Sequence, residues 1–212
     1  MARKEGTRNA RYEERRAELV ARLRARLEQR TDAPPSWREL AAAAGVSLST
    51  LSQYFGRRED VVRAVMEDDL AAGAEPLAMM ADPSGPFAHS IADALQHMAA
   101  GFRHGGLGGL FARGLIEGLR HEAIGPAFLQ SALEPTLSAV ERRLQVHIDR
   151  GEMLAVDPRG PAIALVSPVL LAFLHQYELG GQVVRPLDTE AFLSEHAKAF
   201  VRAWKSKGDA SL

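Results

Sequence analysis

Apolar residues recur three and four positions apart along almost the whole chain, which is the spacing of one face of an α-helix. The first such stripe contains Leu19, Leu23 and Leu27, and it predicts a helix over about residues 10–30. No stretch alternates between apolar and polar residues for long enough to predict a strand. The pattern therefore predicts an all-α fold of about nine helices.

Capping residues divide the segment after this stripe into two short helices. Ser36 stands three residues before Glu39, which is the spacing of a capping box, so a helix is predicted to begin just after Ser36. Gly45 is suited to the left-handed conformation that ends a helix, Ser47 can cap the next helix, and Gly56 can end that one. Two short helices joined by a glycine-containing turn are the signature of a helix-turn-helix.

Prolines, glycines and aspartates divide the rest of the chain into longer helices. Residues 81–86 (ADPSGP) separate two of them, and a later helix is predicted to end near Gly125. Asp157 is predicted to cap a helix that continues through Tyr177 and is apolar on nearly all sides, which indicates burial or an interface. Asp188 is predicted to cap the last helix.

Charge is unevenly distributed, although the net charge of the 212 residues is −1. Residues 1–64 contain 14 of the 26 Lys and Arg residues but only 9 of the 27 Asp and Glu residues, so the rest of the chain is acidic. A basic N-terminal part is typical of a protein that contacts nucleic acid there, although arginine-rich helices also serve solubility alone. We predict a DNA-binding head over residues 1–66 and a larger helical body over residues 67–212.

Several classes of site are excluded or disfavoured by the residues present. The absence of cysteine excludes disulfides, cysteine-ligated zinc and iron–sulfur clusters. No Walker-type Gly-Lys pair, Gly-x-Ser-x-Gly elbow or His-Glu-x-x-His helix occurs, so we expect no enzyme, no metal site and no cofactor. The first ten residues contain no apolar signal region, and the longest apolar run is too short to span a bilayer. We therefore expect a cytoplasmic protein with no membrane partner.

The second helix of a helix-turn-helix presents its exposed side to the major groove. Here that side offers short hydrogen-bonding side chains that suit base edges, and the flanking arginines suit phosphates. The predicted DNA-binding residues are Arg38, Ser47, Leu48, Ser49, Thr50, Ser52, Gln53, Tyr54 and Arg58.

Residues Ser36–Val65 (SWRELAAAAGVSLSTLSQYFGRREDVVRAV) resemble the DNA-binding region of the TetR (tetracycline-repressor-like) regulators. Ser52 departs from the pattern, because these regulators commonly have there a tyrosine that contacts the DNA backbone. The matching positions are Leu40-Ala41, Ala44-Gly45-Val46-Ser47, Thr50-Leu51, Tyr54-Phe55, Arg58-Glu59 and Val61.

The resemblance implies a repressor that binds a palindromic operator in double-stranded DNA as a homodimer. It also implies dimerisation through the last two helices, and release from the operator by a small effector bound in the body. An alternative is a DNA-binding regulator without a small-molecule effector, which is controlled by a partner protein or is constitutive.

The predicted effector site is apolar, so a hydrophobic or amphipathic effector is expected. Its placement inside the body follows mainly from the resemblance. The candidate lining residues are Met98, Phe102, Phe111, Leu115, His147 and Phe173.

Overall fold

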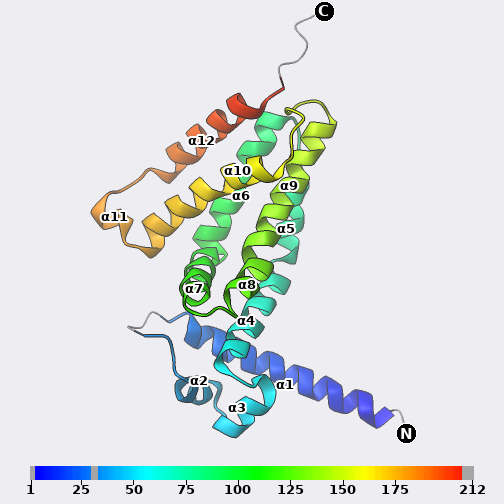
Figure 1. Cartoon of the computed structure of the whole chain (residues 1–212), viewed down its shortest axis with the longest axis vertical. Helices are drawn as coiled ribbons and strands as arrows, with labels where there is room; N and C mark the ends of the chain where they lie inside the picture. The colour runs from blue at the N-terminus through cyan, green and yellow to red at the C-terminus, as the bar shows by residue number, and fades with distance from the viewer. Residues whose placement is uncertain (1–2, 30–32, 207–212) are drawn as a thin grey trace, which may run out of the picture. The chain divides into compact units, whose positions relative to one another are not determined.

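The computed structural model describes residues 3–29 and 33–206, and the side chains from residue 10 onward within those ranges (Figure 1). These residues form helices and no strand, apart from one isolated bridge between Met153 and Lys205. The prediction of an all-α fold is confirmed.

The helices follow one another with short connections. Two π-helical turns, η1 (Leu129–Leu133) and η2 (Leu174–Glu178), continue α8 and α10. The α-helices are α1 (Arg3–Leu27), α2 (Trp37–Ala44), α3 (Leu48–Phe55), α4 (Arg58–Ala72), α5 (Ala74–Ala81), α6 (Phe87–His104), α7 (Leu107–Arg120), α8 (Gly125–Phe128), α9 (Glu134–Asp149), α10 (Arg159–Phe173), α11 (Gly181–Val184) and α12 (Thr189–Trp204).

The helices form two compact units, and each unit consists of two segments of the chain. Unit 1 comprises the residues up to Ala72 together with Arg113–Ser131. Unit 2 comprises Gly73–Ala112 and Ala132–Leu212. The predicted head ends at residue 66, whereas unit 1 continues to Ala72 and also includes the second half of α7 and all of α8.

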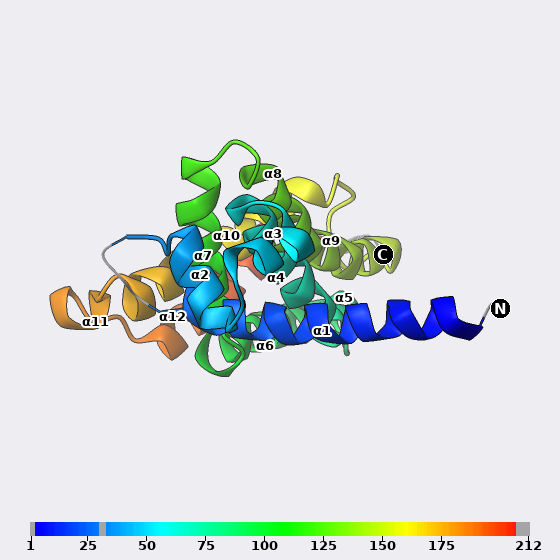
Figure 2. The same ribbon diagram turned by 90° about the horizontal axis from the view of Figure 1, so that it is seen from below.

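Unit 1 is built around α1, which packs against α2 and α4 (Figure 2). Leu19 and Leu23 of α1 are completely buried, as are Leu40 of α2 and Leu51 of α3. Helix α2 also packs on α3, and α4 packs on α3 and α8. The apolar stripe that predicts the first helix is therefore the face around which the short helices assemble.

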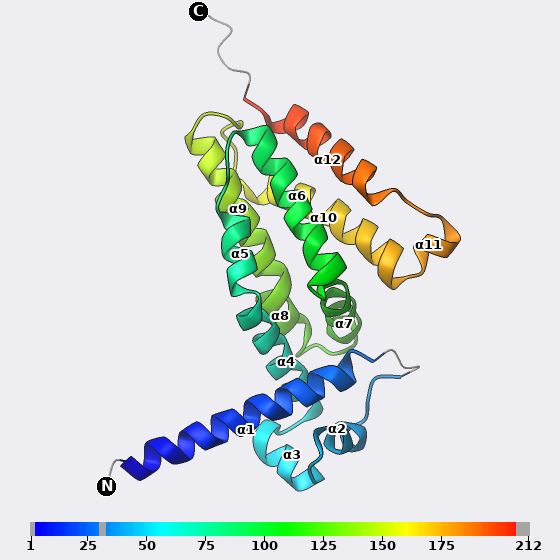
Figure 3. The same cartoon turned by 180° about the vertical axis from the view of Figure 1, so that it is seen from behind.

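Unit 2 is a bundle in which α10 packs against α6, α9 and α12, while α12 also lies beside α6 (Figure 3). Phe87, Ile91 and Leu95 of α6 belong to its core, together with Phe173 and Phe200. In the described part of the chain, residues 159–178 form one stretch that is long and apolar enough to cross a membrane. Half of that stretch is buried inside the structure, which is the environment of a core helix.

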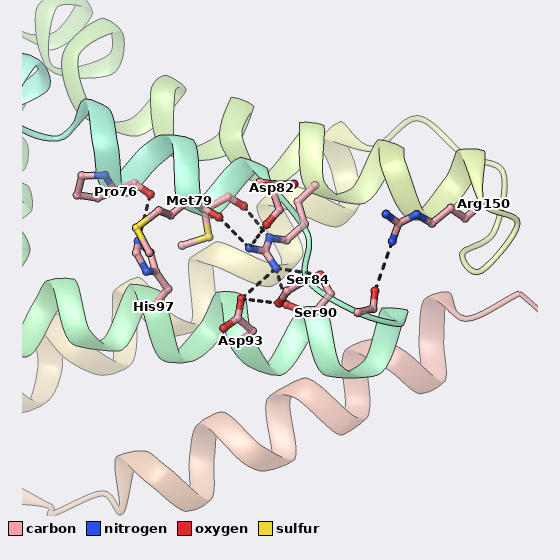
Figure 4. A network of polar contacts seen from close by, with 11 residues as sticks. Pro76, Met79, Asp82, Ser84, Ser90, Asp93, His97 and Arg150 are labelled. Atoms are coloured by element: carbon pink, nitrogen blue, oxygen red, sulfur yellow. Dashed lines mark hydrogen bonds and ion pairs between the residues drawn. The ribbon is translucent and has the colours of Figure 1, made fainter.

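A buried arginine, Arg143, joins three helices of unit 2, and its partners Met79, Asp82 and Ser90 are labelled in Figure 4. Arg143 of α9 is 1 % exposed. Its Nε donates to the Met80 carbonyl at 2.6 Å, and its Nη2 donates to the carbonyls of Met79 and Asp82 at 3.0 and 2.9 Å. Its Nη1 donates to the carbonyl and hydroxyl of Ser90, both at 2.9 Å. Arg143 thus occupies the last carbonyls of α5, which have no partner within their own helix.

Three predicted helix boundaries in the second half of the chain are wrong. The helix predicted to end near Gly125 ends at Arg120, because residues 121–124 form a turn closed by hydrogen bonds to the His121 carbonyl. The helix predicted to begin at Pro158, after a cap at Asp157, begins one residue later at Arg159, and the Asp157 carboxylate accepts a hydrogen bond from the Arg159 N–H. That helix does not continue uniformly through Tyr177, since it widens into the π-helical turn η2.

Candidate nucleic-acid interface

The start of α2 has the capping box that the sequence predicts. The Ser36 Oγ accepts a hydrogen bond from the Glu39 N–H at 3.3 Å, and the Glu39 carboxylate accepts one from the Ser36 N–H at 2.8 Å. This second hydrogen bond lowers the pKa of Glu39. Gly45 ends α2 with φ 69° and ψ 35°, a left-handed conformation that turns the chain toward α3.

Helix α3 is capped by Ser47, whose Oγ accepts a hydrogen bond from the Thr50 N–H at 3.1 Å. The hydroxyls of Ser49 and Thr50 lie 2.9 Å from the same Oγ, so three predicted DNA-binding residues share hydrogen bonds within the first turn. Leu51 and Phe55 face the core of unit 1. The exposed residues of α3 are Leu48, Ser49, Ser52 and Gln53.

Tyr54 is engaged by α1. Its ring stacks on that of Tyr12, with the centroids 4.8 Å apart and an interplanar angle of 11°. Tyr54 is half-buried as a result, whereas Tyr12 is 38 % exposed. The stacked pair of rings thus joins α1 to α3.

The two arginines predicted to contact phosphates differ in their surroundings. Arg38 on α2 is exposed. Arg58, at the start of α4, has only 15 % of its side chain exposed. Its Nη1 and Nη2 donate to the two carboxylate oxygens of Glu117 at 2.9 and 2.5 Å, and its Nε donates to the Pro35 carbonyl at 2.9 Å. The hydrogen bonds to Glu117 raise the pKa of Arg58.

We call this set of contacts, from Pro35 through Arg58 to Glu117, the Arg58 bridge. Glu117 belongs to the segment of α7 that packs within unit 1, and its side chain is 5 % exposed. Removing one partner of a buried ion pair typically costs about 3–5 kcal/mol, because the other charge is left buried without compensation. The bridge is therefore a strong constraint on the position of the Arg58 guanidinium.

A second set of ion pairs joins the same elements. Asp69 of α4 accepts hydrogen bonds from the Arg24 Nε of α1 and from the Arg113 Nη2 of α7, both at 2.8 Å. Arg113 and Glu117 lie four residues apart on one face of α7 and are buried, whereas the third charged residue of this helix, Arg120, is exposed at its end. A charged pair among apolar residues is the signal in the sequence from which buried partners on another element can be inferred.

Only some of the candidate effector residues lie together. The Phe102 ring centroid is 6.0 Å from that of Phe111 and 5.1 Å from that of Phe173, and Tyr177 extends the group at 5.4 Å from Phe173. The Arg103 guanidinium lies over the Phe173 ring, 5.5 Å from its centroid. We call Phe102, Phe111, Phe173 and Tyr177 the aromatic group.

The other candidate effector residues are in different places. Met98 is buried one turn before Phe102 on α6. His147 is fully buried beside Phe87, and its Nδ1 is hydrogen-bonded to Glu152 at 2.5 Å. Phe87 and Phe102 stand at opposite ends of α6, which corresponds to about 22 Å along a helix. Leu115 is 37 % exposed and belongs to unit 1.

Comparison with known proteins identifies the fold. No family model matches the sequence, and no curated protein does either. A protein from Mesorhizobium loti MAFF303099 assigned to the TetR family of transcriptional regulators is similar in structure, with a TM-score of 0.71 and 19% identity over 92% of this chain and 98% of that one. The chain has the fold of the TetR-family regulators.

Further TetR-like structures agree over most of their length. A TetR transcription regulator from Haloarcula marismortui has a TM-score of 0.69 and 17% identity, over 92% of this chain and 100% of that one. The transcriptional regulator FadR from Bacillus subtilis, solved in complex with stearoyl-CoA, has a TM-score of 0.66 and 14% identity, over 87% of this chain and 97% of that one. At these identities the likeness concerns the TetR-like fold itself.

Proposed function

We propose that the chain is a DNA-binding transcriptional regulator, most simply a repressor, that binds a palindromic operator as a homodimer. The observation that carries the proposal is the exposed side of α3, where Leu48, Ser49, Ser52 and Gln53 are uncharged and accessible in a helix-turn-helix of a TetR-like fold. Gln53 can form two hydrogen bonds with adenine, and Leu48 can contact a thymine methyl group.

The proposed phosphate contacts are made by Arg38 and by Arg57, both of which are exposed. Ser52 is too short to replace the tyrosine that TetR regulators commonly have at this position, so Arg57, together with Tyr54, is proposed to supply the missing backbone contact. Of the other predicted residues, Ser47 caps α3, and Thr50 donates its N–H to the Ser47 side chain.

The proposed dimer forms through α10 and α12, which are the last two long helices. The outer side of α10 carries Ile163, Ala164, Ser167 and Leu171, none of which is charged, and Leu171 is 67 % exposed. An exposed apolar stripe on a long helix suits a symmetric interface in which the same surface of both subunits is buried.

The proposed effector is a hydrophobic or amphipathic molecule that binds near the aromatic group. The group supplies apolar surface, and Arg103 supplies a cation at its edge. The Bacillus subtilis FadR regulator, which has the same fold, was solved in complex with stearoyl-CoA, and that molecule is amphipathic. The alternative, regulation by a partner protein or constitutive binding, requires no effector.

The test is selection of duplexes from a randomised DNA pool by the purified chain, followed by salt titration on the enriched duplex. We expect a palindromic sequence to be enriched, and log K to fall linearly with log salt. Replacing Arg38 by Gln should make that slope shallower by about two, since one phosphate contact is lost from each subunit of the dimer. Enrichment of no sequence would contradict the proposed function.

A further inference from the structure

We propose that Arg58 is a positioning residue of the helix-turn-helix, held in place by Glu117, and that it does not contact a DNA phosphate. This inference rests on the proposed function, because it concerns how the DNA-binding surface is oriented. It assigns a role in DNA binding to Glu117, which lies 59 residues from Arg58 in the sequence and far from the helix-turn-helix along the chain.

The Arg58 bridge joins both ends of the helix-turn-helix to one carboxylate. Pro35 directly precedes Ser36, the N-cap of α2, so its carbonyl marks where the chain enters the motif. Arg58 begins α4, two residues after Gly56, where the chain leaves α3. A single guanidinium therefore fixes the entry and the exit of the α2–α3 pair relative to Glu117, and with them the orientation of α3.

The geometry of the guanidinium opposes a phosphate contact. Two edges of its plane are already occupied, one by both Glu117 oxygens and one by the Pro35 carbonyl. Turning toward a phosphate would leave the Glu117 carboxylate buried without its partner, which is unfavourable. His121 Nε2 is 3.8 Å from a Glu117 oxygen, beyond hydrogen-bonding distance, so it does not replace the arginine.

A lysine substitution distinguishes an Arg58 that contacts a phosphate from an Arg58 that orients the helix-turn-helix. A lysine still contacts a phosphate as a point charge, but it cannot form the planar two-pronged contact with a carboxylate while also donating to a carbonyl. Replacing Arg58 by Lys should therefore preserve DNA binding if Arg58 contacts phosphate, and should impair it if Arg58 orients the helix-turn-helix.

The experiment measures binding of the full-length chain to the duplex that the wild type enriches from a randomised pool, as a function of salt. The variants are R58K, R58Q, E117Q and the double variant R58Q/E117Q. We expect each to bind that duplex at least about tenfold more weakly, with the salt slope unchanged, because recognition is impaired and no phosphate contact is lost. The double variant should bind no more weakly than either single variant, since both changes break the same bridge.

Two controls calibrate these measurements. E122Q removes an exposed carboxylate from the same segment and should leave affinity and slope close to those of the wild type. R38Q should make the slope shallower by about two, one for each subunit of the dimer. Circular dichroism of every variant establishes that the helices are formed. If R58Q does not fold, the affinity of R58K for the duplex tests the inference.

The outcomes distinguish the inference from the proposed function. Wild-type binding with a shallower slope for R58Q, full binding by R58K, and equal or tighter binding by E117Q would overturn the inference and leave the proposed function intact. If the wild type enriches no duplex, the proposed function fails, and the inference fails with it.

Discussion

Arg58 of unit 1 is partly buried and Arg143 of unit 2 is fully buried; each joins distant parts of the chain, and the two arginines are stabilised in different ways. Arg58 in unit 1 is paired with the Glu117 carboxylate, and that contact raises its pKa. Arg143 in unit 2 donates mainly to backbone carbonyls, and burial lowers its pKa. Its nearest carboxylate oxygen, on Asp93, is 3.3 Å away and belongs to a side chain that is 47 % exposed.

The comparison separates compensation of charge from satisfaction of hydrogen bonds. Carbonyl groups accept hydrogen bonds from Nε, Nη1 and Nη2 of Arg143, but they are dipoles and do not neutralise the cation. The Glu117 carboxylate accepts two hydrogen bonds from Arg58 and also neutralises its charge. The contact of Arg58 with Glu117 can therefore be replaced by apolar side chains of similar volume, whereas Arg143 has no such substitute, because the carbonyls around it would lose their donors.

The largest effect is expected from Arg143→Met. Methionine has a similar length but no donor, so the buried contacts with the Met80 and Ser90 carbonyls and the part-buried contacts with those of Met79 and Asp82 would be lost. We expect the free energy of unfolding to fall by about 5 kcal/mol, because several acceptors lose their donor and each buried one costs about 1–3 kcal/mol. Urea denaturation followed by circular dichroism measures this. Arg142→Met, on the exposed side of the same helix, should cost less than about 0.5 kcal/mol; equal losses in the two variants would refute the role given to Arg143.

The next largest effect is expected from two variants of the Arg58–Glu117 ion pair, which test whether apolar side chains can replace it. Glu117→Leu alone leaves the Arg58 cation buried, and should reduce the free energy of unfolding by about 3–5 kcal/mol. Adding Arg58→Met should recover most of that loss, because apolar replacements of a buried ion pair are often neutral. The same urea titrations measure both variants. A double variant as unstable as Glu117→Leu would mean that the donation to Pro35, and not the ion pair, dominates.

The smallest effect concerns an exposed contact in unit 1. Ser36→Ala removes the N-cap of α2 and should reduce the free energy of unfolding by about 1 kcal/mol. The exposed Ser194→Ala of α12 is the control and should have no measurable effect. Because the pKa of Glu39 is lowered in the folded chain, its capping contribution is present above its unfolded pKa and is lost as the pH falls through the folded value. The Ser36 hydroxyl donates to the same carboxylate at 2.7 Å, a contact that Ser36→Ala removes, so the difference between this variant and the wild type should shrink in acid.

The local features of the fold could be predicted from the sequence. The caps at Ser36, Ser47 and Asp188 depend on residues two or three positions away, so a single sequence contains both partners. The apolar stripe of α1 likewise follows from residues of the same helix. These features can be predicted without knowing which helices pack together.

The non-local features could not be predicted. The periodicity of α7 shows which of its residues are apolar, but not that Glu117 meets Arg58 or that this helix is divided between two units. His147 borders an apolar stripe, and that position alone places it among the predicted effector residues. In the structure it is hydrogen-bonded to Glu152 and lies beside Phe87, far along α6 from the aromatic group. Both cases depend on which helices become neighbours, and apolar spacing does not encode that choice.

The interleaved path of the chain has a consequence for synthesis on the ribosome. The chain passes between the units three times, after Ala72, Ala112 and Ser131. When residue 72 has emerged, Arg58 and Asp69 still lack Glu117 and Arg113, so the helix-turn-helix is complete in sequence but not in its contacts. A nascent or proteolytic fragment that ends before residue 113 would contain every residue proposed to contact DNA. It would still lack the ion pairs that fix the orientation of the helix-turn-helix. Competence to recognise an operator would then arise only after Glu117 has emerged, past the middle of the 212-residue chain.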